Sequence, residues 1–143
     1  MNGDLRQSLI EHMERTRQCY IKRDIEGYLA GFADSYISFQ LNGEFFENKD
    51  SLREKMLREF ERYDLLSMDF EVVQIHFSDK MGYAQLRYIS KLKPVTPMSN
   101  QHRILIDKRE NLIVARREAD GGWLIEAKIV LNAENYYEPL PGH

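Results

Sequence analysis

Histidine is the side chain whose charge changes near neutral pH, so it is the first type to search for a general acid or base. The chain has four histidines, at positions 12, 76, 102 and 143. His76 ends the segment 70–76, where alternate side chains turn from apolar to polar, and this favours a strand end at solvent or a dimer surface over a base inside a pocket. His102 stands at the start of an expected strand, directly after a proline-containing loop. His76 and His102 are therefore the candidate general bases, and His12, which lies off the apolar stripe of its helix, is expected at the surface.

Polar residues alternate with apolar ones in the segment SYISFQL. In a strand Tyr36, Ser38 and Gln40 share one face, and a purely structural core has no need of three polar groups in a row. This row predicts hydrogen bonds to a ligand. Tyr88 is a further candidate, because tyrosine combines an apolar ring with a hydroxyl, although aromatic core packing or an interface is the alternative reading.

Signatures of metal and cofactor binding are missing from the sequence. There is no His-x-His or His-x-x-x-His pair, and the single cysteine, Cys19, has no second thiol to share a metal. The eight glycines stand singly or in turns rather than in a phosphate-binding loop. We expect no metal site and no cofactor.

The composition is that of a single folded domain. The 143 residues are 43% hydrophobic and 30% charged, with a formal net charge of −3. A nucleic-acid-binding protein usually shows a basic excess, and a membrane span needs about 20 apolar residues in a row, so neither partner is expected. The charged N-terminal segment has no apolar signal-peptide core, and with one cysteine the cytoplasm is the expected location.

The first half of the chain predicts helices. Apolar side chains three and four residues apart indicate a helix through Leu5 to Tyr20, a short second helix from Asp24, and a third over about 50–63. Between the second and third helices, the strand at 35–41 and the dipeptide Asn42-Gly43 predict a hairpin, since both residues tolerate positive φ.

The second half predicts strands. β-branched and aromatic segments are separated by short turns, which is typical of an antiparallel meander. The polar stretch 107–111 leaves open whether 103–119 is one strand or two. The row of alternate residues from Trp123 to Leu131 is expected on the core side, and the tail 133–143 is expected to be extended and to leave the sheet near Asn132. The predicted class is α+β, with three N-terminal helices packed on a strongly curved, mainly antiparallel sheet in a single domain, 1–143.

Five short motifs follow one another along this pattern. They are Tyr20-Ile-Lys-Arg-Asp24, Gly31-Phe32-Ala33-Asp34, Asn42-Gly43, Asn48-Lys-Asp-Ser-Leu52 and Asp120-Gly-Gly-Trp123. In this order they resemble the nuclear transport factor 2-like (NTF2-like) superfamily, a cystatin-like cone fold that includes the SnoaL-like polyketide cyclases and ketosteroid isomerases. Asn48 stands where these families usually have glycine, and asparagine tolerates left-handed backbone angles.

The resemblance implies a pocket between sheet and helices, open at one end, and a dimer formed through the outer face of the sheet. The tyrosine and aspartate of the isomerases fall on Thr16 and Gln40. An amide cannot act as a general base, so ketosteroid-isomerase chemistry is not expected. Thr16 and Gln40 are instead predicted to line the pocket as hydrogen-bonding groups.

Together these features predict a small-molecule-binding protein of the SnoaL-like type. Its pocket would take an apolar or aromatic ligand, with isomerase, cyclase or lyase chemistry in which positioned hydrogen bonds stabilise an enolate-like charge. The alternative is a non-catalytic module for dimerisation or association. The half-polar row that would face a second copy consists of Tyr83, Gln85, Arg87, Ile89 and Lys91.

Overall fold

The computed structural model describes residues 2–95 and 103–139, and it contains three helices and six strands. The helices are α1 (Asn2–Ile21), α2 (Ile25–Leu29) and α3 (Lys49–Arg62). The strands are β1 (Phe32–Gln40), β2 (Phe45–Asn48), β3 (Tyr63–Phe77), β4 (Met81–Pro94), β5 (Arg103–Arg117) and β6 (Trp123–Pro139). No helix in the described part is long and apolar enough to cross a membrane.

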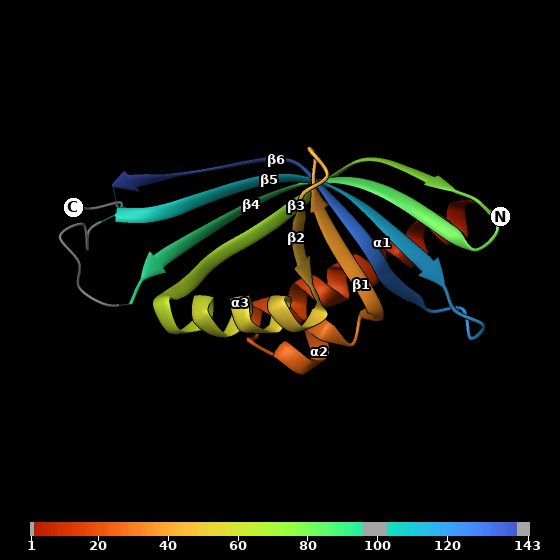
Figure 1. The fold of residues 1–143 in the computed structure, drawn as a ribbon, viewed down its shortest axis with the longest axis horizontal. Coiled ribbons are helices and arrows are strands. Elements are labelled where there is room, and N and C mark those ends of the chain that lie inside the picture. Colours follow the sequence, from red (N-terminus) through yellow and green to blue (C-terminus); the bar gives the residue numbers. More distant parts are fainter. Residues whose placement is uncertain (1, 96–102, 140–143) are drawn as a thin grey trace.

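The strands form one sheet in the order β2-β1-β6-β5-β4-β3. All neighbouring pairs are antiparallel except β1 and β6, which run parallel. All three helices lie on the same side of the curved sheet (Figure 1). The predicted α+β class, the three helices and the antiparallel meander are confirmed. The segment 103–117 is one strand, which answers the question that its polar stretch left open.

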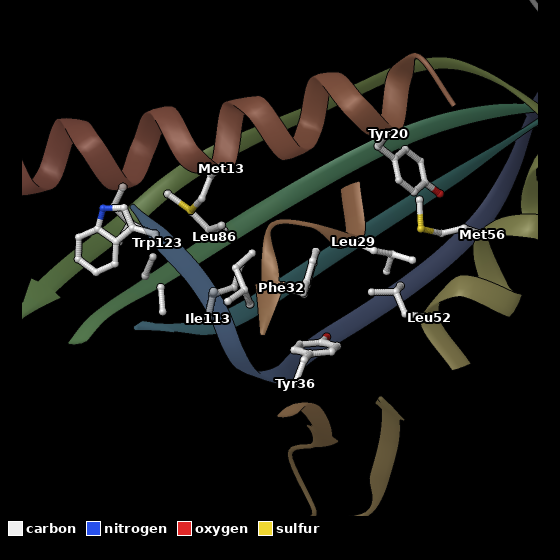
Figure 2. Packing of buried hydrophobic residues seen from close by; sticks show 14 residues of the cluster. Met13, Tyr20, Leu29, Phe32, Tyr36, Leu52, Met56, Leu86, Ile113 and Trp123 are labelled. Carbon is white, nitrogen blue, oxygen red and sulfur yellow. The ribbon is translucent and has the colours of Figure 1, made fainter. Parts of the chain in front are cut away.

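The core lies between the three helices α1, α2 and α3 and the inner face of the sheet (Figure 2). A chain of aromatic rings runs through it, with ring centres 4.8–5.5 Å apart. Its members, in order of contact, are Phe60, Tyr20, Tyr28, Phe32 and Tyr36. These rings connect α1, α2, α3 and β1, so they fix the helices against the first strand.

A bulge at Glu126 in β6 decides which of the side chains of this strand face the core. Val114 pairs with Ala127 but Ala115 pairs with Ile125, so Glu126 is an extra residue. A one-residue bulge reverses the faces of the residues that follow it. Trp123 and Ile125 are therefore buried in the core, whereas Lys128 replaces Ile129 on the inner face. The prediction of one continuous apolar row to Leu131 is wrong beyond Ile125.

Three further expectations are corrected by the structure. The tail does not leave the sheet near Asn132, because β6 stays paired with β5 to Pro139; residues 140–143 lie outside the described part. Asn48 has an extended backbone, with φ −122°, and caps α3 by exchanging hydrogen bonds with Ser51. His12 is buried rather than exposed, with Nε2 3.1 Å from the Gly31 carbonyl oxygen. The predicted turn at Asn42-Gly43 is present, with Gly43 at φ 88°.

Candidate functional site

A cavity of about 360 Å³ opens between the helices and the inner face of the sheet. This volume lies within the range of small-molecule sites. Side chains of α1, α2 and α3 form one wall, and side chains from all six strands of the sheet form the other. The apolar side chains that line it are Met13, Phe32, Leu52, Met56, Met68, Ile113 and Ile125.

The predicted site residues divide into two groups. Thr16 and Tyr88 line the cavity, although the Thr16 hydroxyl donates a hydrogen bond to the Met13 carbonyl. Tyr36 and Ser38 are buried but are not among the residues that line the cavity. Gln40 lies away from the cavity, beside a shallow surface hollow at the end of β1.

Of the two candidate histidines, the structure places only His76, and this residue does not line the cavity. His76 is exposed near the end of the edge strand β3, with Nε2 3.0 Å from Oε1 of Gln74. This agrees with the interpretation of a strand end at solvent. His102 lies outside the described residues. Among the described residues no histidine lines the cavity, and its ionisable groups belong to other residue types.

Glu47 on β2 is the most deeply buried charged group at the cavity, because its side chain is only 2% exposed. Three side chains donate to it. The Tyr36 hydroxyl and Lys55 Nζ each lie 2.7 Å from a carboxylate oxygen, and Lys128 Nζ lies 3.1 Å away. Burial alone would raise the pKa of Glu47, but Lys128, Lys55 and Tyr36 together lower it, so this carboxylate is ionised. Burial lowers the pKa of Lys128, and Glu47 opposes that change.

Three cations surround the ring of Phe46, which is the extra residue of a bulge between β1 and β2. Lys55 Nζ lies 3.4 Å from the ring centre, Lys128 Nζ 5.4 Å, and the Arg109 guanidinium carbon 5.7 Å. Arg109 also contacts Asp107, with 3.2 Å between Nε and Oδ2. Cations at these distances are attracted to the face of an aromatic ring, and here the ring holds three of them at one edge of the cavity.

Glu59 on α3 is the second carboxylate of the cavity, and its environment differs from that of Glu47. It accepts a hydrogen bond from the Tyr20 hydroxyl. It forms no ion pair with any of the described residues. Burial raises its pKa, with a further contribution from Asp107, and the Tyr20 hydrogen bond opposes the increase. A carboxylate whose pKa is raised toward neutrality is a better proton acceptor and donor near pH 7. Glu59 is therefore the candidate general base of this site.

Two tyrosine hydroxyls and one amide have unused hydrogen-bonding capacity at the cavity. Tyr28 and Tyr88 make no side-chain hydrogen bond among the described residues, and burial raises the pKa of both hydroxyls, which therefore stay neutral donors. The Oδ1 atom of Asn111 is buried without a hydrogen-bond partner in the described part of the chain. Buried polar groups in proteins nearly always have a hydrogen-bond partner. Because these three groups have none among the described residues, they are available to bind a ligand.

No group of three or more metal-ligating side chains occurs within residues 2–95 and 103–139. Sequence reasoning missed Glu47, Lys128, Arg109 and Glu59. Two signals were present: Glu47 follows two phenylalanines in a short strand, and Lys128 follows Glu126 as the second charged residue in the otherwise apolar run WLIEAKIVL. A charged residue inside an apolar strand is rarely buried without a partner, and the two residues are in fact partners.

Comparison with known proteins places the fold but not the activity. No family model and no curated protein sequence matches the chain. Among solved structures, a conserved protein from Planctomyces limnophilus superposes with a TM-score of 0.78 at 14% identity, covering 98% of this chain and 100% of that one. A ketosteroid isomerase-like protein from Erwinia carotovora atroseptica gives 0.70 at 16% identity, covering 92% and 97%.

A putative Ca/calmodulin-dependent kinase II association domain from Exiguobacterium sibiricum gives a TM-score of 0.69 at 7% identity, covering 88% of this chain and 91% of that one. Several other matches are described as NTF2-like proteins. The chain therefore has the fold of the NTF2-like superfamily, as its motifs predicted. Because this fold carries catalytic and non-catalytic proteins alike, the function must be argued from the cavity.

Proposed function

We propose that this protein binds a small molecule with an apolar or aromatic body in the cavity between the helices and the sheet. The observation that carries the proposal is a cavity of about 360 Å³ that combines seven apolar side chains with charged groups and with the Tyr28 and Tyr88 hydroxyls, which have no hydrogen-bond partner among the described residues. A concave site in which apolar side chains are combined with placed polar groups is typical of small-molecule binding. With one free cysteine, Cys19, the cytoplasm remains the predicted location.

The arrangement also supports chemistry of the isomerase, cyclase or lyase type. Glu59 would remove a proton from a carbon beside a carbonyl group, and a tyrosine hydroxyl would donate a hydrogen bond to the enolate oxygen that forms. The proton stays on Glu59 until it is returned to another atom of the product. Gln40 takes no part, because an amide is not a base and lies away from the cavity.

Binding is tested by thermal shift with a panel of apolar and aromatic compounds. Met68 lines the cavity from β3, so Met68→Trp should fill it and abolish the increase in melting temperature. Leu66→Trp is the matched control, because Leu66 lies on the same strand and is 50% exposed. A ligand that stabilises the wild type and Met68→Trp equally is bound elsewhere, and the cavity proposal is then wrong.

Catalysis is tested on the ligands found in that screen. Carbonyl-containing ligands are incubated with protein in D₂O, and NMR follows deuterium entering the carbon beside the carbonyl. Glu59→Gln should stop the exchange while retaining binding, and Glu61→Gln, on the exposed side of α3, should change neither. Exchange that persists in Glu59→Gln would exclude Glu59 as the base.

A second candidate function is association through the outer face of the sheet. Tyr83, Arg87 and Ile89 on β4 are exposed there, as the sequence predicted, and the bulge at Glu126 turns Ile129 to the same side. We propose that this face forms a twofold homodimer. Sedimentation should show a species of twice 17.0 kDa at tens of micromolar protein, and Ile89→Arg should reduce it to the monomer. A monomer in the wild type at that concentration contradicts the dimer.

A further inference from the structure

The cavity carries more positive than negative charge, although the chain as a whole has a net charge of −3. Five of its lining residues are basic and three are acidic, which leaves two positive charges when all are ionised. They are Lys55, Arg58, Arg62, Arg109 and Lys128 against Glu47, Glu59 and Asp107. The sign of the cavity is therefore opposite to that of the protein.

Part of this excess of positive charge comes from the three cations around Phe46. Lys55, Lys128 and Arg109 all lie within 5.7 Å of the ring centre, measured from their cationic atoms. Glu47 is shared by both lysines, and Asp107 contacts Arg109. By direct contact, these three cations are paired with only two carboxylates, and the Lys128 side chain is 17% exposed. The third carboxylate of the cavity, Glu59, is near enough for Arg109 and Lys55 to lower its pKa but forms no ion pair among the described residues. A partly buried charge without a counter-charge is unfavourable, so this group favours a bound anion.

Asn111 supplies an independent sign of a ligand. Its side chain is 4% exposed and lines the cavity, and Oδ1 has no hydrogen-bond partner in the described part of the chain. Asn111 stands two residues from Arg109 on β5, so both side chains project from the same face of the sheet. An N–H or O–H group placed there would satisfy the amide oxygen beside the cations.

We infer that the ligand of this cavity is a small organic carboxylate with an apolar body and a nearby hydroxyl or N–H group. This inference rests on the proposed binding function and specifies its ligand class. The carboxylate would meet Lys128, Lys55 and Arg109, and the hydroxyl or N–H group would donate to Asn111. The apolar body would lie against the methionines and aromatic rings of the helical wall. Arg58 and Arg62, which line the cavity and are exposed to solvent, add attraction for an approaching anion.

The test compares compounds that differ only in the charge of one end. Two matched sets are used: 3-phenylpropionate with its amide and amine, and 1-naphthaleneacetate with its amide and amine. Calorimetry should show that the carboxylate of at least one set binds roughly tenfold more tightly than its amide, with no binding of the amine. Inorganic phosphate at equal concentration should bind more weakly than that carboxylate, because it has no apolar body.

Variants assign the preference to residues. Lys128→Met leaves Glu47 paired with Lys55, so the fold should be retained, and the ratio of carboxylate to amide affinity should fall toward one. Lys55→Met tests the same point through Lys128 if the first variant does not fold. Lys80→Met, at an exposed position in the turn between β3 and β4, is the matched control. Asn111→Leu should weaken 2-hydroxy-3-phenylpropionate, whose hydroxyl stands on the carbon next to the carboxylate, more than 3-phenylpropionate.

The outcomes separate this inference from the proposed function. Amides or amines that bind as tightly as the carboxylates overturn the anion preference and leave the apolar binding site intact. A preference that survives in both Lys128→Met and Lys55→Met also overturns it, as does phosphate binding as tightly as the carboxylates. If none of the compounds binds and the wider apolar panel also gives no shift, the proposed function itself is wrong.

Discussion

Glu47 and Lys128 meet across a strand that lies between them. Ser38 on β1 pairs with Glu47 on β2 and with Lys128 on β6, so the three residues form one row across the sheet. Lys128 Nζ nevertheless reaches Glu47 Oε2 at 3.1 Å, over a sequence separation of 81 residues. The side chain between them is small and fully buried, which leaves space for the longer side chains to touch above it.

Glu47→Gln should destabilise the protein by about 3 kcal/mol, because it leaves two partly buried lysines without their shared carboxylate. Urea unfolding measures the change in the free energy of unfolding. Glu44→Gln, on the exposed hairpin, is the matched control. The double variant Glu47→Gln, Lys128→Met should recover more than half of the loss, since one of the two uncompensated charges is then gone. A Glu47→Gln variant as stable as the control would show that the lysines do not depend on this carboxylate.

Ser38 provides a test of the space above it. Its hydroxyl oxygen is buried without a hydrogen-bond partner among the described residues, so Ser38→Ala should change stability by less than about 1 kcal/mol, in either direction. Ser38→Leu should cost about 2–3 kcal/mol through overpacking and should separate Glu47 from Lys128. Ile37→Leu, on the opposite face of β1, is the control in the same urea measurement. Equal stability of Ser38→Leu and Ser38→Ala would contradict this geometry.

His12 predicts a dependence of stability on pH. Burial lowers its pKa below 6.5, with a smaller contribution from Arg15, although the bond to the Gly31 carbonyl opposes the decrease. As pH falls below 6.5, the unfolded chain takes up a proton on this imidazole before the folded protein does. The free energy of unfolding therefore falls on acidification, by at most about 1.4 kcal/mol per pH unit, until the pH passes the pKa of the folded state.

His12→Gln keeps a donor for the Gly31 carbonyl but does not titrate, so it should lose less stability than the wild type between pH 7.5 and 5.5. Urea unfolding at both pH values measures the difference. His76→Gln removes an exposed histidine and serves as control. The assignment to His12 fails if His12→Gln loses as much stability over this range as the wild type.

Tyr20→Phe should raise the pKa of Glu59 further. The hydrogen bond from the Tyr20 hydroxyl favours the ionised carboxylate and so opposes the effect of burial. The loss of a hydrogen bond to a charged group should also cost about 1.5 kcal/mol of stability above the pKa of Glu59. A ¹³C NMR titration of the Glu59 carboxyl group measures the pKa, with the exposed Tyr83→Phe as control. An unchanged or lower pKa in Tyr20→Phe would mean that the hydrogen bond does not favour the ionised carboxylate.

The sequence was sufficient for the element order because apolar periodicity and turn residues act locally. It predicted α3, the Asn42-Gly43 turn and the meander after Asp64, and it placed Thr16 and Tyr88 at the cavity. It did not predict the cation group, because Lys128 faces inward only as a result of the bulge at Glu126. His12 was misplaced for a similar reason: its partner is a backbone carbonyl 19 residues away, and no side-chain pattern marks that contact.

The parallel pairing of β1 with β6 has a consequence for folding. β1 is the earliest strand in the chain, yet the neighbour that joins it to the main sheet begins at Trp123. The hairpin of β1 and β2 and the carboxylate of Glu47 cannot take their final places until β6 has formed. Pairings between such distant segments slow folding, because a long loop must close before they form. We expect hydrogen-exchange labelling during refolding to protect the amides of β3, β4 and β5 before those of β1.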